Sequence, residues 1–111
     1  MQPHGVVTPE PPYIAVIFTF RLDRKNLAEY EALLKEINAI SADQDGFLGE
    51  EGLRLEDGRG LTISYWRNME AVASWQRHAA HILAKKAGRE KFYLSYSLRI
   101  SEVTRESVFE R

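Results

Sequence analysis

The chain has no cysteine among its 111 residues. Disulfide bonds, thiolate nucleophiles and cysteine-bound zinc or iron–sulfur centres are therefore excluded. An excess of charge of either sign is also missing, because the formal net charge is −1. Such a chain has no strong electric field that would attract nucleic acid or an acidic membrane surface. We therefore expect no nucleic acid and no membrane among its partners.

Proline and long apolar runs are scarce as well. All four prolines fall within the first twelve residues, which predicts an extended N-terminal arm over residues 1–12 and one domain over residues 13–111. The clean apolar run at residues 14–18 is far too short to cross a bilayer. The N-terminus also lacks the basic and apolar regions of a secretory signal. A cytoplasmic protein is the expected class.

Four stretches of alternating apolar residues predict β-strands, at residues 13–22, 47–56, 61–66 and 91–103. The dipeptide Asp57-Gly58, between the middle two stretches, predicts a hairpin turn. These four segments account for about a third of the chain.

Two stretches have the apolar spacing of amphipathic helices. The first is expected to begin after Asp23 and to end near Ser41, where turn-forming residues follow. The second is expected to begin after Asn68 and to run without interruption to about Ala87. On a helical wheel Leu83 lies on the apolar face of this second helix.

The order β-α-β-β-α-β predicts an α+β, ferredoxin-like fold: a four-stranded antiparallel sheet with two helices on one face. Right-handed crossovers are expected to leave room for one strand between the first and the third. The second sheet face is not polar, because apolar residues of the first and last strands point towards it; they are Tyr13, Ala15, Ile17, Tyr93 and Val103. A large apolar patch is typical of an interface, so we expect a homodimer through this open face.

Scarce residue types gather in one short stretch of the sequence. Trp66, Trp75, His78 and His81 fall within sixteen positions. Two interpretations remain open: a packed helix that carries imidazoles, or the wall of a pocket. On the second interpretation His78, beside Trp75, is the favoured proton acceptor, since an imidazole exchanges protons near neutral pH. His81, one turn later, is expected to be more exposed, and a surface histidine is its alternative interpretation.

Four acidic residues lie close together at Glu50, Glu51, Glu56 and Asp57. Glu50 and Glu51 would point to opposite faces of a strand, so these carboxylates do not converge as metal ligands must. We expect a solvated strand end and no metal site.

Several segments resemble the antibiotic biosynthesis monooxygenase family, a group of dimeric α/β barrels. The resemblance covers residues 45–103 most clearly, and its more specific marks are Trp66 at the end of a strand, His81 and the tripeptide at residues 88–90. The matching segments are "DGFLGEEGLR", "ISYW", "SWQRHAAH", "AGRE" and "FYLSYSLRISEV".

The resemblance implies a monooxygenase that oxidises a small aromatic phenol, enol or quinol with O2, using neither metal nor flavin. His-assisted deprotonation would produce an anion that passes an electron to oxygen directly. The resemblance implies a pocket whose catalytic candidates are His78, His81 and Trp66. Its substrate-binding candidates are Trp75, Tyr96, Phe18 and Leu34.

The chain departs from the polyketide-oxidising branch of this family at two positions. Thr62 stands where that branch has Asn, and Val72 stands where it has Tyr. Another branch binds or degrades haem, and it has an Asn on the first strand that residues 13–22 lack. Two alternatives therefore stay open beside the cofactor-independent oxygenase: a haem-binding or haem-degrading monooxygenase, and a non-catalytic dimeric ligand-binding or stress-related module.

Overall fold

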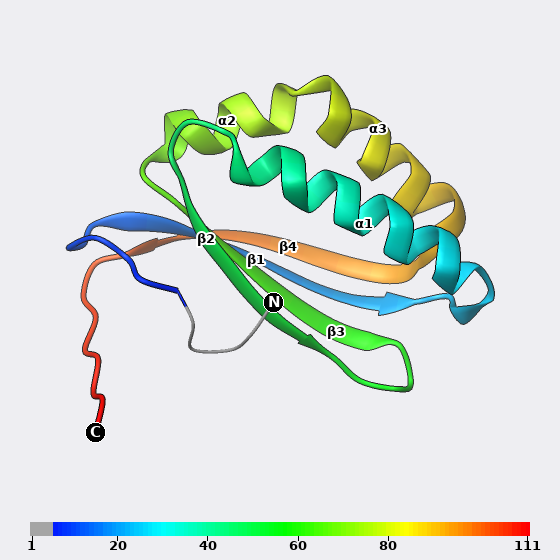
Figure 1. Ribbon diagram of the computed structural model, residues 1–111, viewed down its shortest axis with the longest axis horizontal. Coiled ribbons are helices and arrows are strands. Elements are labelled where there is room, and N and C mark those ends of the chain that lie inside the picture. Colours follow the sequence, from blue (N-terminus) through cyan, green and yellow to red (C-terminus); the bar gives the residue numbers. More distant parts are fainter. Residues whose placement is uncertain (1–5) are drawn as a thin grey trace.

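The computed structural model describes residues 6–111 and has the predicted α+β, ferredoxin-like fold (Figure 1). Its sheet contains β1 (Tyr13–Leu22), β2 (Phe47–Arg54), β3 (Arg59–Trp66) and β4 (Tyr93–Val103). Three α-helices lie on one side of the sheet: α1 (Leu27–Ala42), α2 (Met69–Arg77) and α3 (Ala79–Ala87). Of the predicted N-terminal arm, residues 1–5 lie outside the described residues, and residues 6–12 form neither helix nor strand. No helix within residues 6–111 combines the length and the apolar character needed to span a membrane.

The strand order is β2-β3-β1-β4, and all neighbours in the sheet are antiparallel. The expectation of one strand between the first and the third is wrong, because β1 pairs directly with β3, from Ile14 opposite Trp66 to Arg21 opposite Arg59. The intervening strand lies instead between β1 and β2. The crossover through α1 makes these two strands parallel, and β3 fills the space that the crossover leaves.

A register shift in β2 decides which of its side chains face the helices. The pairing with β3 slips between Phe47 and Gly49, and Gly49 has φ of 151°. Beyond the slip Glu50 pairs with Ser64, which shares the helix-facing side of the sheet with Trp66. Because side chains alternate along a strand, Glu50 and Arg54 lie on that side as well.

The second predicted helix is interrupted at His78, so it forms two helices instead of one. His78 has extended backbone angles (φ −65°, ψ 136°), and its Nδ1 atom accepts a hydrogen bond from the Ala80 N–H at 3.0 Å. With this cap α3 begins as a separate helix. Asn68 caps α2 in the same way, because its side chain accepts a hydrogen bond from the Ala71 N–H. The break changes which side chains face the sheet. Leu83, predicted on the apolar face, is 67% exposed.

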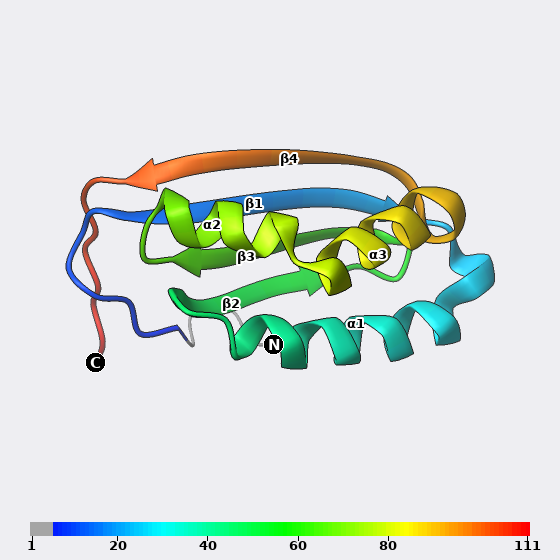
Figure 2. The same ribbon diagram turned by 90° about the horizontal axis from the view of Figure 1, so that it is seen from above.

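The helices are held on the sheet by two groups of buried side chains. The indole cluster (Ile14, Trp66, Val72 and Trp75) lies at the start of β1 and under α2. The tyrosine cluster (Phe20, Leu22, Tyr30 and Phe92) lies at the end of β1 and under the beginning of α1. Seen from above, no helix of residues 6–111 crosses over β4 (Figure 2). For this reason Leu98 and Ile100 remain exposed, although they share the helix-facing side of the sheet.

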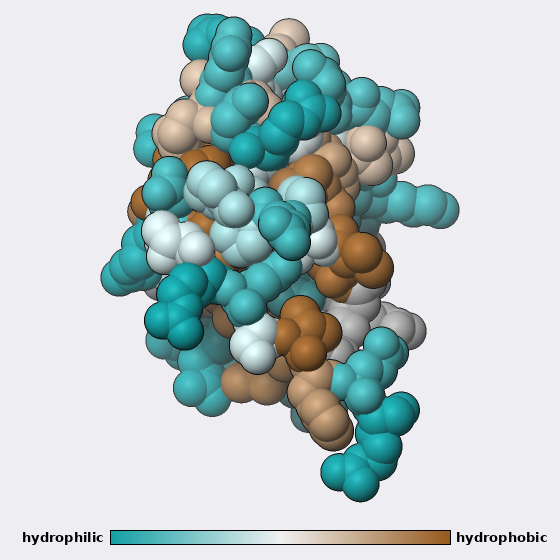
Figure 3. All heavy atoms as spheres, turned by 90° about the vertical axis from the view of Figure 1, so that its left-hand side faces the viewer, coloured by the Kyte–Doolittle hydropathy of each residue, from teal (hydrophilic) through white to brown (hydrophobic). Residues whose placement is uncertain are grey.

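The other face of the sheet carries Ile17 and Ile63 directly opposite each other. At one end of this face the C-terminal segment covers Tyr13, whose hydroxyl donates to Glu106 Oε2 at 2.7 Å. Tyr93 was expected on this face, but it packs on the helix side, because the pairing of β1 with β4 shifts between Arg21 and Leu22. At the end where the two terminal segments leave the sheet, hydrophobic atoms are exposed in patches between hydrophilic side chains (Figure 3).

Candidate functional site

The structure brings both candidate histidines into contact with Trp75 on the helix side of the sheet. The His78 ring centre lies 5.2 Å from that of Trp75, and the His81 ring centre lies at the same distance. Trp66 stacks on Trp75 from the sheet, with ring centres 6.3 Å apart and an angle of 23° between the rings. Two imidazoles and two indoles therefore form one continuous group of rings.

His78 has a structural role at the junction of α2 and α3. Its Nδ1 atom accepts the hydrogen bond that caps α3, and its backbone N–H donates to the Trp75 carbonyl at 3.0 Å. A nitrogen that already accepts a hydrogen bond is not free to take a proton from a substrate. Of the two ring nitrogens, only Nε2 takes no part in the capping hydrogen bond.

His81 is the histidine whose ring nitrogen is shielded. Its Nδ1 atom is buried and has no hydrogen-bond partner among residues 6–111. Both histidines are half-buried as residues, and the buried Nδ1 atom shows that His81 is not a freely exposed surface histidine. Burial lowers the pKa of His81, and the nearby Lys85 and His78 act in the same direction, while a hydrogen bond with the Gln76 backbone opposes them. The ring is therefore neutral near neutral pH.

Trp66 is part of the packed core. It is 1% exposed, its Nε1–H donates to Ser64 Oγ at 2.9 Å, and Phe47 meets it edge-on at 5.2 Å. Its indole can act as a rigid wall behind Trp75, but its only polar atom is already bonded within the sheet.

The remaining predicted substrate-binding residues lie with the other cluster. Phe18, Leu34 and Tyr96 pack against the tyrosine cluster, where the ring centres of Phe18 and Tyr96 are 5.2 Å apart. The structure thus divides the predicted pocket lining between the two ends of β1. Trp75 belongs to one end and these three residues to the other.

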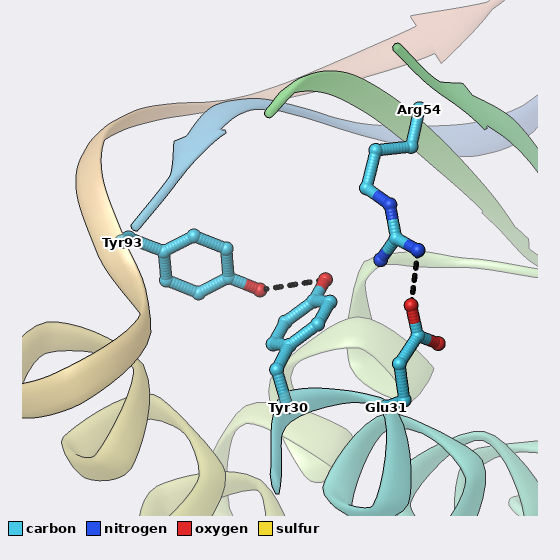
Figure 4. Close-up of polar contacts among 4 residues, drawn as sticks. All are labelled: Tyr30, Glu31, Arg54 and Tyr93. Carbon is cyan, nitrogen blue, oxygen red and sulfur yellow. Dashed lines mark hydrogen bonds and ion pairs between the residues drawn. The ribbon is translucent and has the colours of Figure 1, made fainter. Parts of the chain in front are cut away.

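Sequence reasoning missed a pair of tyrosines that lies beside these three residues. Tyr93 at the start of β4 donates its hydroxyl to that of Tyr30 on α1 at 3.4 Å (Figure 4). Burial raises the pKa of both tyrosines, so both hydroxyls stay protonated near neutral pH. Because Tyr93 donates, the Tyr30 proton is available to another acceptor.

Arg54 lies over this tyrosine pair. Its guanidinium carbon is 5.8 Å from the centre of the Tyr30 ring, and the same group forms an ion pair with Glu31 of α1 (Figure 4). Both contacts follow from the shifted register of β2, which points Arg54 towards α1. Gly49 was a signal in the sequence for that shift, because an isolated glycine in a strand indicates a bulge.

Glu50 is the second consequence of the shift. We expected a solvated carboxylate at this position, but burial raises the pKa of Glu50. Its side chain lies on the helix-facing side, next to small residues: Gly52 of the same strand, and Thr62 and Ser64 of β3. Within residues 6–111, no three histidine, aspartate or glutamate side chains are grouped closely enough to hold a metal ion.

Two cavities accompany these groups. One, of about 380 Å³, opens between the β2–β3 hairpin and the start of α1, and Arg54 lines it. The other, of about 520 Å³, is wider open and crosses the ends of β1, β3 and β4, where Arg21 and Arg59 line it. His78, His81 and Trp66 do not line either of these two cavities.

Comparison with known proteins gives a consistent result. Residues 13–87 match the family model described as antibiotic biosynthesis monooxygenase. The chain is 44% identical over 103 residues to the uncharacterized protein YqjZ of Bacillus subtilis, and the alignment covers 93% of this chain and 90% of YqjZ. It is 31% identical over 94 residues to a jasmonate monooxygenase of Pyricularia oryzae, covering 81% of this chain and 43% of that protein.

The fold is shared with solved structures of low sequence identity. SnoaB, a cofactor-independent oxygenase from Streptomyces nogalater, matches with a TM-score of 0.70 and 17% identity, over 91% of this chain and all of SnoaB. A second neighbour, Rv0793 from Mycobacterium tuberculosis, matches with a TM-score of 0.75 and 14% identity, over 86% of this chain and 99% of that one.

Proposed function

The chain belongs to the antibiotic biosynthesis monooxygenase family, and from this membership and the geometry around Trp75 we propose that it is a cofactor-independent monooxygenase. Its substrate is a small aromatic phenol, enol or quinol, and its oxidant is O2. The jasmonate monooxygenase and SnoaB, a cofactor-independent oxygenase, support the general reaction type.

One observation carries the mechanism: the buried Nδ1 atom of His81, which has no hydrogen-bond partner within residues 6–111. A buried polar atom without a partner costs free energy, and such atoms are found where a ligand or a reaction uses them. Because burial also lowers the pKa of His81, the ring stays neutral and able to accept a proton. We assign the base to His81, and to His78 the positioning of α3.

The reaction balances with O2 alone. For an anthrone-like substrate, His81 takes one proton from the reacting CH2 group, and the resulting anion passes an electron to O2. The two radicals combine through a new C–O bond, and the peroxide receives the proton back from His81. Loss of water, which removes the second C–H proton and breaks the O–O bond, leaves a ketone. In sum CH2 and O2 give C=O and H2O, so no external reductant is needed.

The flat rings of the site fit an aromatic substrate. Trp75 would stack on the substrate with Trp66 as its rigid support, and Phe18, Leu34 and Tyr96 would border the substrate towards the tyrosine cluster. The second sheet face, with Ile17 and Ile63 at its centre, would pair with a second copy to form a homodimer.

Oxygen uptake by metal-free protein, measured with a panel of anthrones and quinols, tests this function. We expect His81→Gln to lower kcat by roughly 10²–10⁴-fold, the usual contribution of a general base. His78→Gln is the matched control, and it is expected to lower stability with a much smaller loss of kcat. Uptake without protein gives the background that must be subtracted.

Two results would overturn the proposal. One is wild-type protein that leaves the uptake of every substrate at its background rate. The other is a His81→Gln variant that is folded and as active as wild type.

A further inference from the structure

The cavity at the β2–β3 hairpin has the size of a small-molecule site. Its volume is about 380 Å³, within the range of roughly 300–1,000 Å³ that is usual for ligand pockets. It lies between the hairpin and the start of α1, so three separate segments form its walls: the end of β1, the first turns before and in α1, and the hairpin itself. The lining residues are Leu22, Arg24, Leu27, Arg54, Leu55, Glu56 and Gly58.

The lining combines an apolar wall with a positive charge. Three leucines line the cavity, and two of them, Leu27 and Leu55, are exposed although they are large and apolar. The lining contains two guanidinium groups and one carboxylate, that of Glu56, so it has a net charge of +1. In ligand sites, a few charged groups of this kind fix the orientation of the ligand, and apolar side chains contact its body.

The two arginines differ in their partners. Arg24 forms no ion pair with any residue in the range 6–111, whereas Arg54 is paired with Glu31. The side chain of Arg54 is 34% exposed and that of Glu31 is 46% exposed. An ion pair this exposed contributes little to stability, so another carboxylate can replace Glu31 at low cost.

We propose that this cavity binds a small organic carboxylate with an apolar body. Leu27 and Leu55 contact the apolar body, and Arg24 and Arg54 hold the carboxylate, for which the planar guanidinium fork is well suited. Glu31 of the free protein occupies Arg54 and is displaced when the ligand binds. This site is separate from the proposed base, because His81 does not line it.

Isothermal titration of the full chain with carboxylates tests the proposal. The probes are benzoate, octanoate and 4-phenylbutyrate, each compared with its neutral alcohol: benzyl alcohol, octanol and 4-phenylbutanol. At least one carboxylate is expected to bind, and its alcohol to bind about tenfold or more weakly, because the charge-assisted hydrogen bonds are lost.

Substitutions then identify the groups involved. We expect Arg24→Gln and Arg54→Gln each to weaken carboxylate binding about tenfold, and Arg54→Lys to restore only part of the loss because it lacks the fork. Glu31→Gln is expected to tighten binding, since it removes the competing carboxylate. Arg59→Gln, in the other cavity, is the matched control for a general change in charge and is expected to bind as wild type does.

Four outcomes would overturn the proposal: no probe binds, the alcohols bind as tightly as the carboxylates, Glu31→Gln leaves affinity unchanged or lower, or Arg59→Gln loses as much affinity as Arg54→Gln. Circular dichroism of each variant verifies that it is folded. Binding to the His81→Gln variant is expected to be unchanged, so failure of the oxygenase function and failure of this site are distinguishable.

Discussion

The two clusters that hold the helices on the sheet are built from different chemistry. In the indole cluster, Trp66 and Trp75 stack on each other, and the polar groups nearby are imidazoles. At the tyrosine cluster, the Tyr30 hydroxyl accepts a hydrogen bond from Tyr93, which packs against the cluster, and the Arg54 guanidinium lies over the Tyr30 ring. Both clusters pack large rings between the same two layers, one at each end of β1.

The two clusters therefore differ in what they can offer: the indole cluster offers mainly packing, and the tyrosine cluster also offers hydrogen-bonding groups. Apart from the two imidazoles, the indole cluster offers a bound substrate mainly ring faces, because the Trp66 N–H is already bonded to Ser64. The tyrosine cluster has hydroxyls and a guanidinium next to a cavity. We therefore expect substitutions in the first cluster to act on stability through lost volume, and those in the second to act through lost hydrogen bonds.

The largest expected effect is in the indole cluster. Trp66→Ala removes a fully buried ring and should lower the free energy of unfolding by about 3–5 kcal/mol, as large-to-small core substitutions do. Denaturant unfolding measures the change. Leu83→Ala is the control, since this exposed side chain should cost no more than ~0.5 kcal/mol. Equal losses at the two positions would contradict the buried position of Trp66.

A smaller effect is expected for the tyrosine pair. Tyr30→Phe leaves the half-buried Tyr93 donor without its acceptor, which should cost ~1–3 kcal/mol. The double variant with Tyr93→Phe should lose less than the sum of the two single losses, because both partners are then gone. A double-mutant cycle from denaturant unfolding measures this coupling. Strictly additive losses would show that the two hydroxyls do not interact.

The losses of stability expected at the two helix caps are smaller and similar to each other. Asn68→Ala removes the cap of α2 and His78→Ala that of α3, and each should cost ~1 kcal/mol. Thermal unfolding of both variants measures the loss. Asn68→Asp keeps an accepting oxygen and serves as the control, with stability close to that of wild type. A His78→Ala variant as stable as wild type would mean that Nδ1 does not cap α3.

The smallest effect is a dependence of stability on pH. Burial lowers the pKa of His81 below its ordinary value of 6.5 in the folded chain. Above that value the ring is neutral in both states and contributes no dependence. As pH falls below it, the unfolded chain binds the proton first, so the folded state loses stability.

This dependence can be measured by chemical unfolding between pH 7.5 and 5.5. Wild type should lose more stability over this interval than His81→Gln, which cannot titrate. Glu50, whose raised pKa acts in the opposite direction, is present in both proteins and does not affect the difference. Equal slopes for the two proteins would contradict a shielded His81.

Much of the fold could be predicted, because its signals are local. All four strands, the turn at Asp57-Gly58 and the cap at Asn68 follow from alternation, turn chemistry and capping, which act over a few residues. The break at His78 could not be predicted in this way. The apolar spacing continues through it, and only packing on the sheet decides that the backbone becomes extended there.

The candidate site was predictable only in part, for the same reason. Trp75 and the two histidines are close in sequence, so one helical segment brings them together. Tyr30, Arg54 and Tyr93 come from three different elements, and their contact requires two register shifts in the sheet. A shift of one residue reverses the side to which every following side chain points, and alternation alone does not reveal where it occurs.

The sequence by itself therefore determined the order of the elements, the antiparallel sheet and the scarce aromatic and imidazole groups near Trp75. Only the tertiary structure decided that the His81 ring nitrogen is shielded, that Glu50 and Arg54 face the helices, and that a cavity opens beside Arg54. The physical reason is the range of the interactions. Periodicity and capping act between near neighbours, whereas register, burial and cavities depend on contacts between segments far apart in the chain.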